Sequence, residues 1–255
     1  MNNSKKQIFA HKNNQLIWGV SLPGLKYFSG VAVVYSLYLC LNISFYQISD
    51  FIHANYAPST YAKYAWDIRA LITENIILQS LVIILILVGL KAYRITASDI
   101  GWETPRKNWT IPASLVFILI YRVVFEAAIS LYNGGSWHLT FSASYLWSRL
   151  HNPMAYYWLL FVPVVSIFEE LFFRGLLFTL LEKKISWQFT IIATALLFSA
   201  SHTNGSSWNF DLNTFICGLI FGAMRKLDGS LWPSITAHLG NNIIANWFTI
   251  TASTI

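Results

Sequence analysis

The chain has 255 residues, of which 55% are hydrophobic and only 11% are charged. Because an ordinary soluble domain carries about 25% charged residues, this composition excludes that class. The formal net charge of +6 does not call for nucleic acid, since basic loops beside lipid head groups are usual in membrane proteins. We therefore expect a polytopic membrane protein that contacts the lipid bilayer and no nucleic acid.

The N-terminal residues 1–26 are polar and basic. They contain neither the early apolar core nor the small-residue cleavage site of a signal peptide. We expect a basic cytoplasmic segment over residues 1–26 and a transmembrane domain over residues 27–250. Cys40 and Cys217 lie within apolar segments, where small packing side chains are expected rather than a disulfide.

Seven apolar segments follow, and each is a candidate membrane-spanning helix because about 20 helical residues cross a bilayer. The segment between Asn133 and Pro153 carries scattered aromatic residues and either adds an eighth, interfacial or re-entrant helix or adds none. The predicted fold class is all-α, a membrane bundle of seven or eight transmembrane helices. In chain order the seven segments are Tyr27–Gln47, Leu71–Leu90, Trp109–Tyr132, Tyr156–Leu181, Trp187–Ser201, Leu212–Met224 and Leu231–Ile250.

Basic residues in the loops predict the orientation, because loops rich in Lys and Arg face the cytoplasm. With the N-terminus inside, the opposite side holds only Lys63, Arg69 and Arg149. The predicted location is a bacterial inner membrane with a cytoplasmic N-terminus. The basic residues then on the cytoplasmic side are Lys5, Lys6, Lys12, Lys26, Lys91, Arg94, Arg106, Lys107, Lys183, Lys184, Arg225 and Lys226.

The fourth span contains SIFEELFFRG, Ser166 to Gly175, with three ionisable side chains. Ionisable groups inside a membrane are costly and usually functional. Glu170 and Arg174 are four residues apart with the acid first, which favours an ion pair within the helix. Glu169 projects about 100° away around the helix, so it is expected to be the spare carboxylate.

Two later helices carry further polar residues. The fifth span ends in FSASH, with Phe198 one turn before His202. The seventh span places His238, Asn242 and Asn246 at four-residue steps, which puts them on one helical face. A buried carboxylate near imidazoles and an amide donor has the parts to hydrolyse a carbonyl compound. No GxSxG elbow is present, so an activated water is the expected nucleophile, and Asn246 is expected to make an interhelical hydrogen bond.

Two further patterns have structural interpretations. Arg122 and Glu126 repeat the four-residue spacing inside the third span. They either line a substrate cavity or form a buried structural ion pair. Gly218 and Gly222 form a small-xxx-small face that permits close helix packing.

The polar motifs occur in a fixed order. EELFFR at 169–174, FSASH at 198–202 and HLGNN at 238–242 resemble the EExxxR, FxxxH and HxxxN motifs of the CAAX-protease and bacteriocin-processing superfamily, also called Abi. That superfamily includes the type II CAAX prenyl endopeptidases. The run from Gly218 to Asn242 resembles the last motif with its preceding helix. The resemblance covers residues 156–248, the predicted motif-bearing core.

The resemblance implies an intramembrane glutamic endopeptidase. It would cut a protein or peptide substrate, including lipidated or membrane-anchored ones, near the C-terminus or a membrane segment. By correspondence, Glu169 activates the attacking water with His202, and His238 with Asn242 stabilises the tetrahedral oxyanion. The positions that correspond to supports of the site's geometry are Glu170 and Arg174.

Three alternatives stay open from the sequence. No cofactor is expected, but Glu169, His202 and His238 also form a two-histidine, one-carboxylate set of the kind that binds zinc or iron, although HExxH is absent. A non-enzymatic bacteriocin-immunity or membrane scaffolding protein would retain the same motifs. A transporter would use Glu169 and the histidines as a proton relay.

Overall fold

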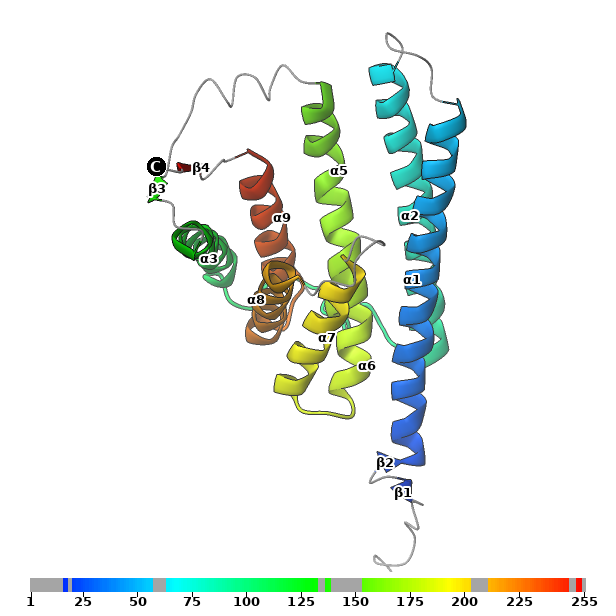
Figure 1. The fold of residues 1–255 in the computed structure, drawn as a ribbon. Coiled ribbons are helices and arrows are strands. Elements are labelled where there is room, and N and C mark those ends of the chain that lie inside the picture. The colour runs from blue at the N-terminus through cyan, green and yellow to red at the C-terminus, as the bar shows by residue number, and fades with distance from the viewer. Residues whose placement is uncertain are drawn as a thin grey trace, which may run out of the picture.

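The computed structural model describes residues 16–17, 20–56, 63–132, 136–138, 153–202, 211–247 and 251–253. Within these ranges the chain is almost entirely helical (Figure 1), which confirms the all-α prediction. There are also two short antiparallel strand pairs. Strand β1 (Leu16–Ile17) pairs with β2 (Val20–Ser21), and β3 (Ser136–His138) pairs with β4 (Thr251–Ser253). The helices are α1 (Leu22–Tyr56), α2 (Lys63–Tyr93), α3 (Thr110–Tyr132), α5 (Pro153–Glu170), α6 (Phe178–Glu182), α7 (Trp187–Ser201), α8 (Leu212–Asp228) and α9 (Trp232–Trp247), with the π-helical segment η1 (Leu171–Leu177) between α5 and α6.

The predicted apolar segments coincide with these helices. The segment Tyr156–Leu181 lies on the continuous rod made by α5, η1 and α6. Three described stretches are long and apolar enough to cross a membrane, and α7 is a shorter apolar helix. The count of seven or eight spans stays a prediction, and the region between Asn133 and Pro153 lies outside the described residues except for β3. The three stretches are Lys26–Ser44, Ile76–Tyr93 and Thr110–Tyr132.

Helix α3 presents an apolar face to the outside of the bundle. Val116, Phe117, Ile120 and Val124 are 54–61% exposed. A continuous exposed apolar face marks contact with lipid or a partner rather than with water. Together with the three long apolar stretches, this face identifies an integral membrane protein.

The rod formed by α5, η1 and α6 lies at the centre of the bundle. It packs against α1, α2, α7, α8 and α9, and every side chain from Phe172 to Leu181 is buried. A helix that is apolar all round belongs in such an interior position. Aromatic rings fill the space beside α1, where Tyr38 stacks on Phe172 with 4.3 Å between ring centroids. The rod therefore holds its acidic residues at a fixed depth inside the bundle.

The turn between α8 and α9 is tied to the start of α3 by one carboxylate. Asp228 accepts hydrogen bonds from the backbone N–H groups of Arg106, Lys107 and Ser230 and from the Thr110 hydroxyl. Asp228 lies beyond the predicted end of its span at Met224. Burial alone would raise its pKa, but these hydrogen bonds hold the pKa of Asp228 below its usual range. This contact fixes the start of α9, which carries two of the predicted site residues.

Candidate active site

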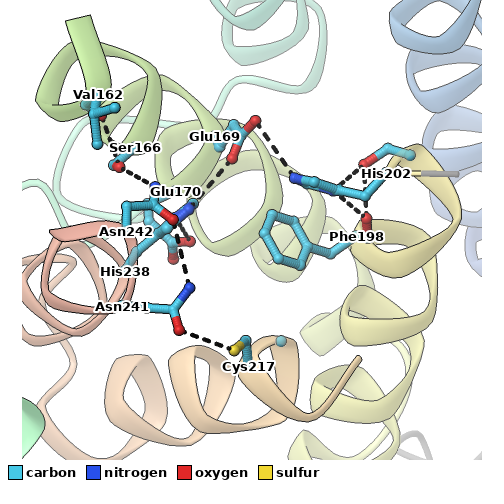
Figure 2. Close-up of polar contacts among 12 residues, drawn as sticks. Val162, Ser166, Glu169, Glu170, Phe198, His202, Cys217, His238, Asn241 and Asn242 are labelled. Atoms are coloured by element: carbon cyan, nitrogen blue, oxygen red, sulfur yellow. Dashed lines mark hydrogen bonds and ion pairs between the residues drawn. The ribbon is translucent and has the colours of Figure 1, made fainter. Parts of the chain in front are cut away.

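Glu169 lies between two imidazoles that come from different helices (Figure 2). Its Oε1 atom is 3.9 Å from Nε2 of His202 at the end of α7, and its Oε2 atom is 3.5 Å from Nε2 of His238 on α9. The Glu169 side chain is 16% exposed and that of His202 is 34% exposed. Both side chains are therefore partly exposed, so a small molecule such as water can reach the carboxylate.

His202 is held by the carbonyl group one turn earlier in its own helix. Its Nδ1 atom is 2.8 Å from the backbone oxygen of Phe198. Because a carbonyl oxygen only accepts hydrogen bonds, Nδ1 carries the proton. The second ring nitrogen, Nε2, faces Glu169. The Phe198 ring packs against the imidazole at 4.4 Å between centroids, so the FxxxH spacing supplies both the hydrogen bond and the packing.

Glu170 and Arg174 form the ion pair expected from their spacing. Nη1 of Arg174 donates to Oε1 of Glu170 at 2.9 Å, and both side chains are fully buried. Nη2 of Arg174 donates to the backbone oxygen of Gly218 at 3.0 Å. The guanidinium carbon also lies 4.4 Å from the ring centroid of Phe198 and 5.2 Å from that of Phe221, distances typical of cation–π contacts. The pair thus joins the central rod to α8 beneath the site.

Glu170 has a second contact that the sequence reasoning missed. Its Oε1 atom is 3.0 Å from Nδ1 of His238, and its Oε2 atom accepts a hydrogen bond from the Ser234 hydroxyl. Ser234 and His238 are one turn apart on α9, so they share a face. That spacing was a signal available in the sequence. Glu170 is therefore an orienting partner of His238 as well as the mate of Arg174.

His238 consequently has a carboxylate at each ring nitrogen. Glu170 lies at Nδ1 and Glu169 at Nε2. The Glu170 contact, at 3.0 Å, is at hydrogen-bond distance, and the Glu169 contact, at 3.5 Å, is longer. The ring is only 3% exposed and stacks on Phe221 with 4.7 Å between centroids. His202 and His238 thus have different environments: a carbonyl holds the first, and two carboxylates hold the second.

Asn242 lies one turn beyond His238 on the same face of α9. Its Nδ2 atom donates to the hydroxyl of Ser166 on α5 at 3.0 Å, and its Oδ1 atom accepts from Nδ2 of Asn241 at 3.4 Å. The structure therefore brings Asn242 against the helix that carries Glu169 (Figure 2). The sequence reasoning missed Ser166, although a lone serine three residues before Glu169 in an apolar run was a signal.

Of the remaining predicted residues, Arg122 and Glu126 form an ion pair, with 2.7 Å between Nη2 and Oε1. The side chain of Asn246 lies outside the described part of the structure. Among the side chains that the structure does describe, no three His, Cys, Asp or Glu residues are grouped so as to hold a metal ion. The alternative metal set stays a prediction, and we derive no step through a metal.

A comparison with known protein families gives a match over the second half of the chain. Residues 151–244 match the family described as type II CAAX prenyl endopeptidase Rce1-like. The matched range contains all three polar motifs, the segments from α5 to α8 and most of α9. Searches against curated proteins and against solved structures give no match.

Proposed function

We propose that the protein is an intramembrane endopeptidase that uses Glu169 to activate water. The match of residues 151–244 to the Rce1-like family of type II CAAX prenyl endopeptidases supports this. The family is a protease family, so the substrate is a protein or peptide. The observation that carries the mechanism is the position of the Glu169 carboxylate, 3.5 Å and 3.9 Å from the Nε2 atoms of two histidines.

In the first step a water molecule beside Glu169 and His202 attacks the carbonyl carbon of the scissile peptide bond. Glu169 takes the water proton, and the lone pair on Nε2 of His202 accepts a hydrogen bond from the same water. General-base catalysis of this kind contributes about 10²- to 10⁴-fold. The long separations fit a site that tightens when substrate binds, as catalytic hydrogen bonds often do.

The tetrahedral intermediate carries a negative oxygen, which needs hydrogen-bond donors. The first donor is Nε2 of His238, whose ring the Glu170 carboxylate orients from the Nδ1 side. The amide Nδ2 of Asn242 is the second donor. Removing one such donor costs about 10²- to 10³-fold in kcat in other hydrolases.

In the last step the C–N bond breaks, and the proton held by Glu169 passes to the leaving amine nitrogen. The products are a new carboxylic acid and a new amine, and the acid's proton then passes to the amine to give carboxylate and ammonium. Glu169 returns to its charged form, so the cycle consumes one water and changes no other bond. Glu170 and Arg174 take no part in the proton transfers; they hold His238 and α8 in position.

The family match and the bilayer support a proposal for the substrate class. We propose that the substrate is a prenylated protein tail or another lipid-anchored peptide, which reaches the site from the membrane. We further propose a bacterial inner membrane and a cytoplasmic N-terminus, which the distribution of basic loop residues supports. Nothing in the mechanism requires a cofactor.

The test uses the full chain in liposomes and a fluorescence-quenched farnesylated peptide that ends in a Cys-Ala-Ala-Met sequence. We expect wild-type protein to cleave the peptide and Glu169→Gln to lose at least about 10²-fold in rate. Glu126→Gln is the matched control, since it neutralises another acid within a helix of the bundle, one that pairs with Arg122. Cleavage by Glu169→Gln at the wild-type rate would overturn the assignment.

A non-enzymatic role makes the opposite prediction. If the chain acts as a bacteriocin-immunity or scaffolding protein, cells that carry Glu169→Ala together with His202→Ala keep the wild-type phenotype, and no peptide is cut. A transporter would show proton-coupled flux in the same liposomes without cleavage.

A further inference from the structure

Ser166 makes two hydrogen bonds, one as donor and one as acceptor. It lies on α5, one turn before Glu170, and is completely buried. Its hydroxyl donates to the backbone oxygen of Val162 at 2.8 Å, and its oxygen accepts from Nδ2 of Asn242 at 3.0 Å. Figure 2 shows these contacts in a line from Val162 through Ser166 to Asn242.

The chemistry of a hydroxyl makes this contact directional. A serine side chain has one O–H and two lone pairs. Since a carbonyl oxygen only accepts, the single proton of Ser166 is committed to Val162, and only lone pairs remain for a second partner. Ser166 therefore bonds to the NH₂ end of the Asn242 amide and not to its oxygen end.

A second contact favours the same orientation. The oxygen end of the Asn242 amide faces Nδ2 of Asn241, and the oxygen of Asn241 in turn lies 3.5 Å from the sulfur of Cys217. An amide is planar, so fixing one N–H and the oxygen also fixes the direction of the second N–H. An amide rotated by 180° would place its oxygen against the lone pairs of Ser166, where the two acceptors repel.

We propose that Ser166 is a positioning residue for the reaction, which orients the Asn242 amide so that its N–H, and not its oxygen, is presented to the oxyanion. The inference rests on the proposed function, in which Asn242 is an oxyanion donor. Ser166 and Glu169 are three residues apart on one helix, so α5 sets both the water-activating carboxylate and the direction of the oxyanion donor.

The test compares Ser166→Ala, Asn242→Ala and the double variant, each as full-length protein in liposomes with the farnesylated peptide reporter. Loss of the hydroxyl lets the amide rotate, and misplacement of a catalytic group costs up to about 10²-fold. We expect Ser166→Ala to lower kcat about 10- to 100-fold with KM unchanged. In the Asn242→Ala background, removal of Ser166 should have no further effect on kcat, because it acts only through the amide.

Ser114→Ala is the matched control. Ser114 is also completely buried, on α3, and donates to a carbonyl of its own helix, that of Ile111, at 2.7 Å. Its replacement removes a buried helical hydroxyl of the same kind without touching Asn242, so kcat should stay at the wild-type value. A general packing effect would lower both serine variants together.

The outcomes distinguish the positioning role of Ser166 from the proposed function itself. If Asn242→Ala lowers kcat but Ser166→Ala behaves like Ser114→Ala, the positioning role is overturned and the proposed function stands. If the effects of Ser166→Ala and Asn242→Ala on kcat multiply, the positioning role is also overturned. If Asn242→Ala cleaves as fast as the wild type, the oxyanion role fails and the positioning role fails with it.

A second measurement does not depend on the reporter. Thermal unfolding of the wild type, the two single variants and the double variant gives a double-mutant cycle. Residues joined by a hydrogen bond should lower the melting temperature by less in the double variant than the sum of the two single shifts. Strict additivity of the two shifts would overturn the contact on which the inference rests.

Discussion

Replacing Arg174 by methionine should destabilise the folded protein strongly. Methionine keeps much of the side-chain volume but removes the guanidinium, so Glu170 loses its 2.9 Å ion-pair partner and Gly218 loses a 3.0 Å donor to its carbonyl. The Glu170 side chain is fully buried, and breaking a buried pair in this way costs about 3–5 kcal/mol. For a chain of this size each kcal/mol corresponds to roughly 2–4 °C in Tm, so we expect a decrease of about 6–20 °C.

The assay is thermal unfolding of purified protein in detergent, followed by tryptophan fluorescence at one fixed scan rate. Arg122→Met is the matched control, because Arg122 forms the same four-residue pair but its partner Glu126 is 30% exposed. A partly exposed carboxylate recovers solvation when its partner is lost, so the control should lose less stability. Equal shifts for the two variants, or no shift for Arg174→Met, would refute the reasoning from burial.

Three further predictions concern packing, pH and metal. Gly218→Ala should lower Tm, since the new Cβ would lie 2.9 Å from the backbone of Ala195 and overpacking costs about 1–3 kcal/mol. An unchanged Tm would contradict this close approach of α7 and α8. The lowered pKa of Asp228 means that its stabilisation is complete above the unfolded pKa of about 3.9 and is lost as pH falls through the folded value. Asp228→Asn should therefore flatten the acid limb of a plot of Tm against pH, and an unaltered limb would argue against the four hydrogen bonds. Chelation with EDTA should leave cleavage unchanged, whereas loss of activity that zinc restores would support a metal-dependent mechanism.

Helix positions were readable from the sequence because apolar runs and helices coincide in a membrane protein. The segment Trp187–Ser201, for example, matches α7 at both ends. The Glu170–Arg174 pair was equally readable, since a four-residue spacing on a helix brings two side chains together. Those predictions needed only local geometry.

Contacts between helices were harder to predict, because hydropathy does not define how helices rotate against one another. The contact of Glu170 with His238 joins α5 to α9, and that of Ser166 with Asn242 joins the same two helices. Sequence spacing places His238 and Asn242 on one face, but it does not say which face of α5 they meet. The π-helical segment η1 was also not predicted, and such segments occur often at functional sites.

The central claim is that Glu169 makes this protein a protease, and peptide termini in cell membranes test it whatever the substrate is. Membrane proteins from cells that carry the wild type, Glu169→Gln or no copy of the chain would be compared by mass spectrometry of their termini. We expect cleaved termini that occur only in cells with the wild type. Identical sets of termini in the wild-type and Glu169→Gln cells would contradict it.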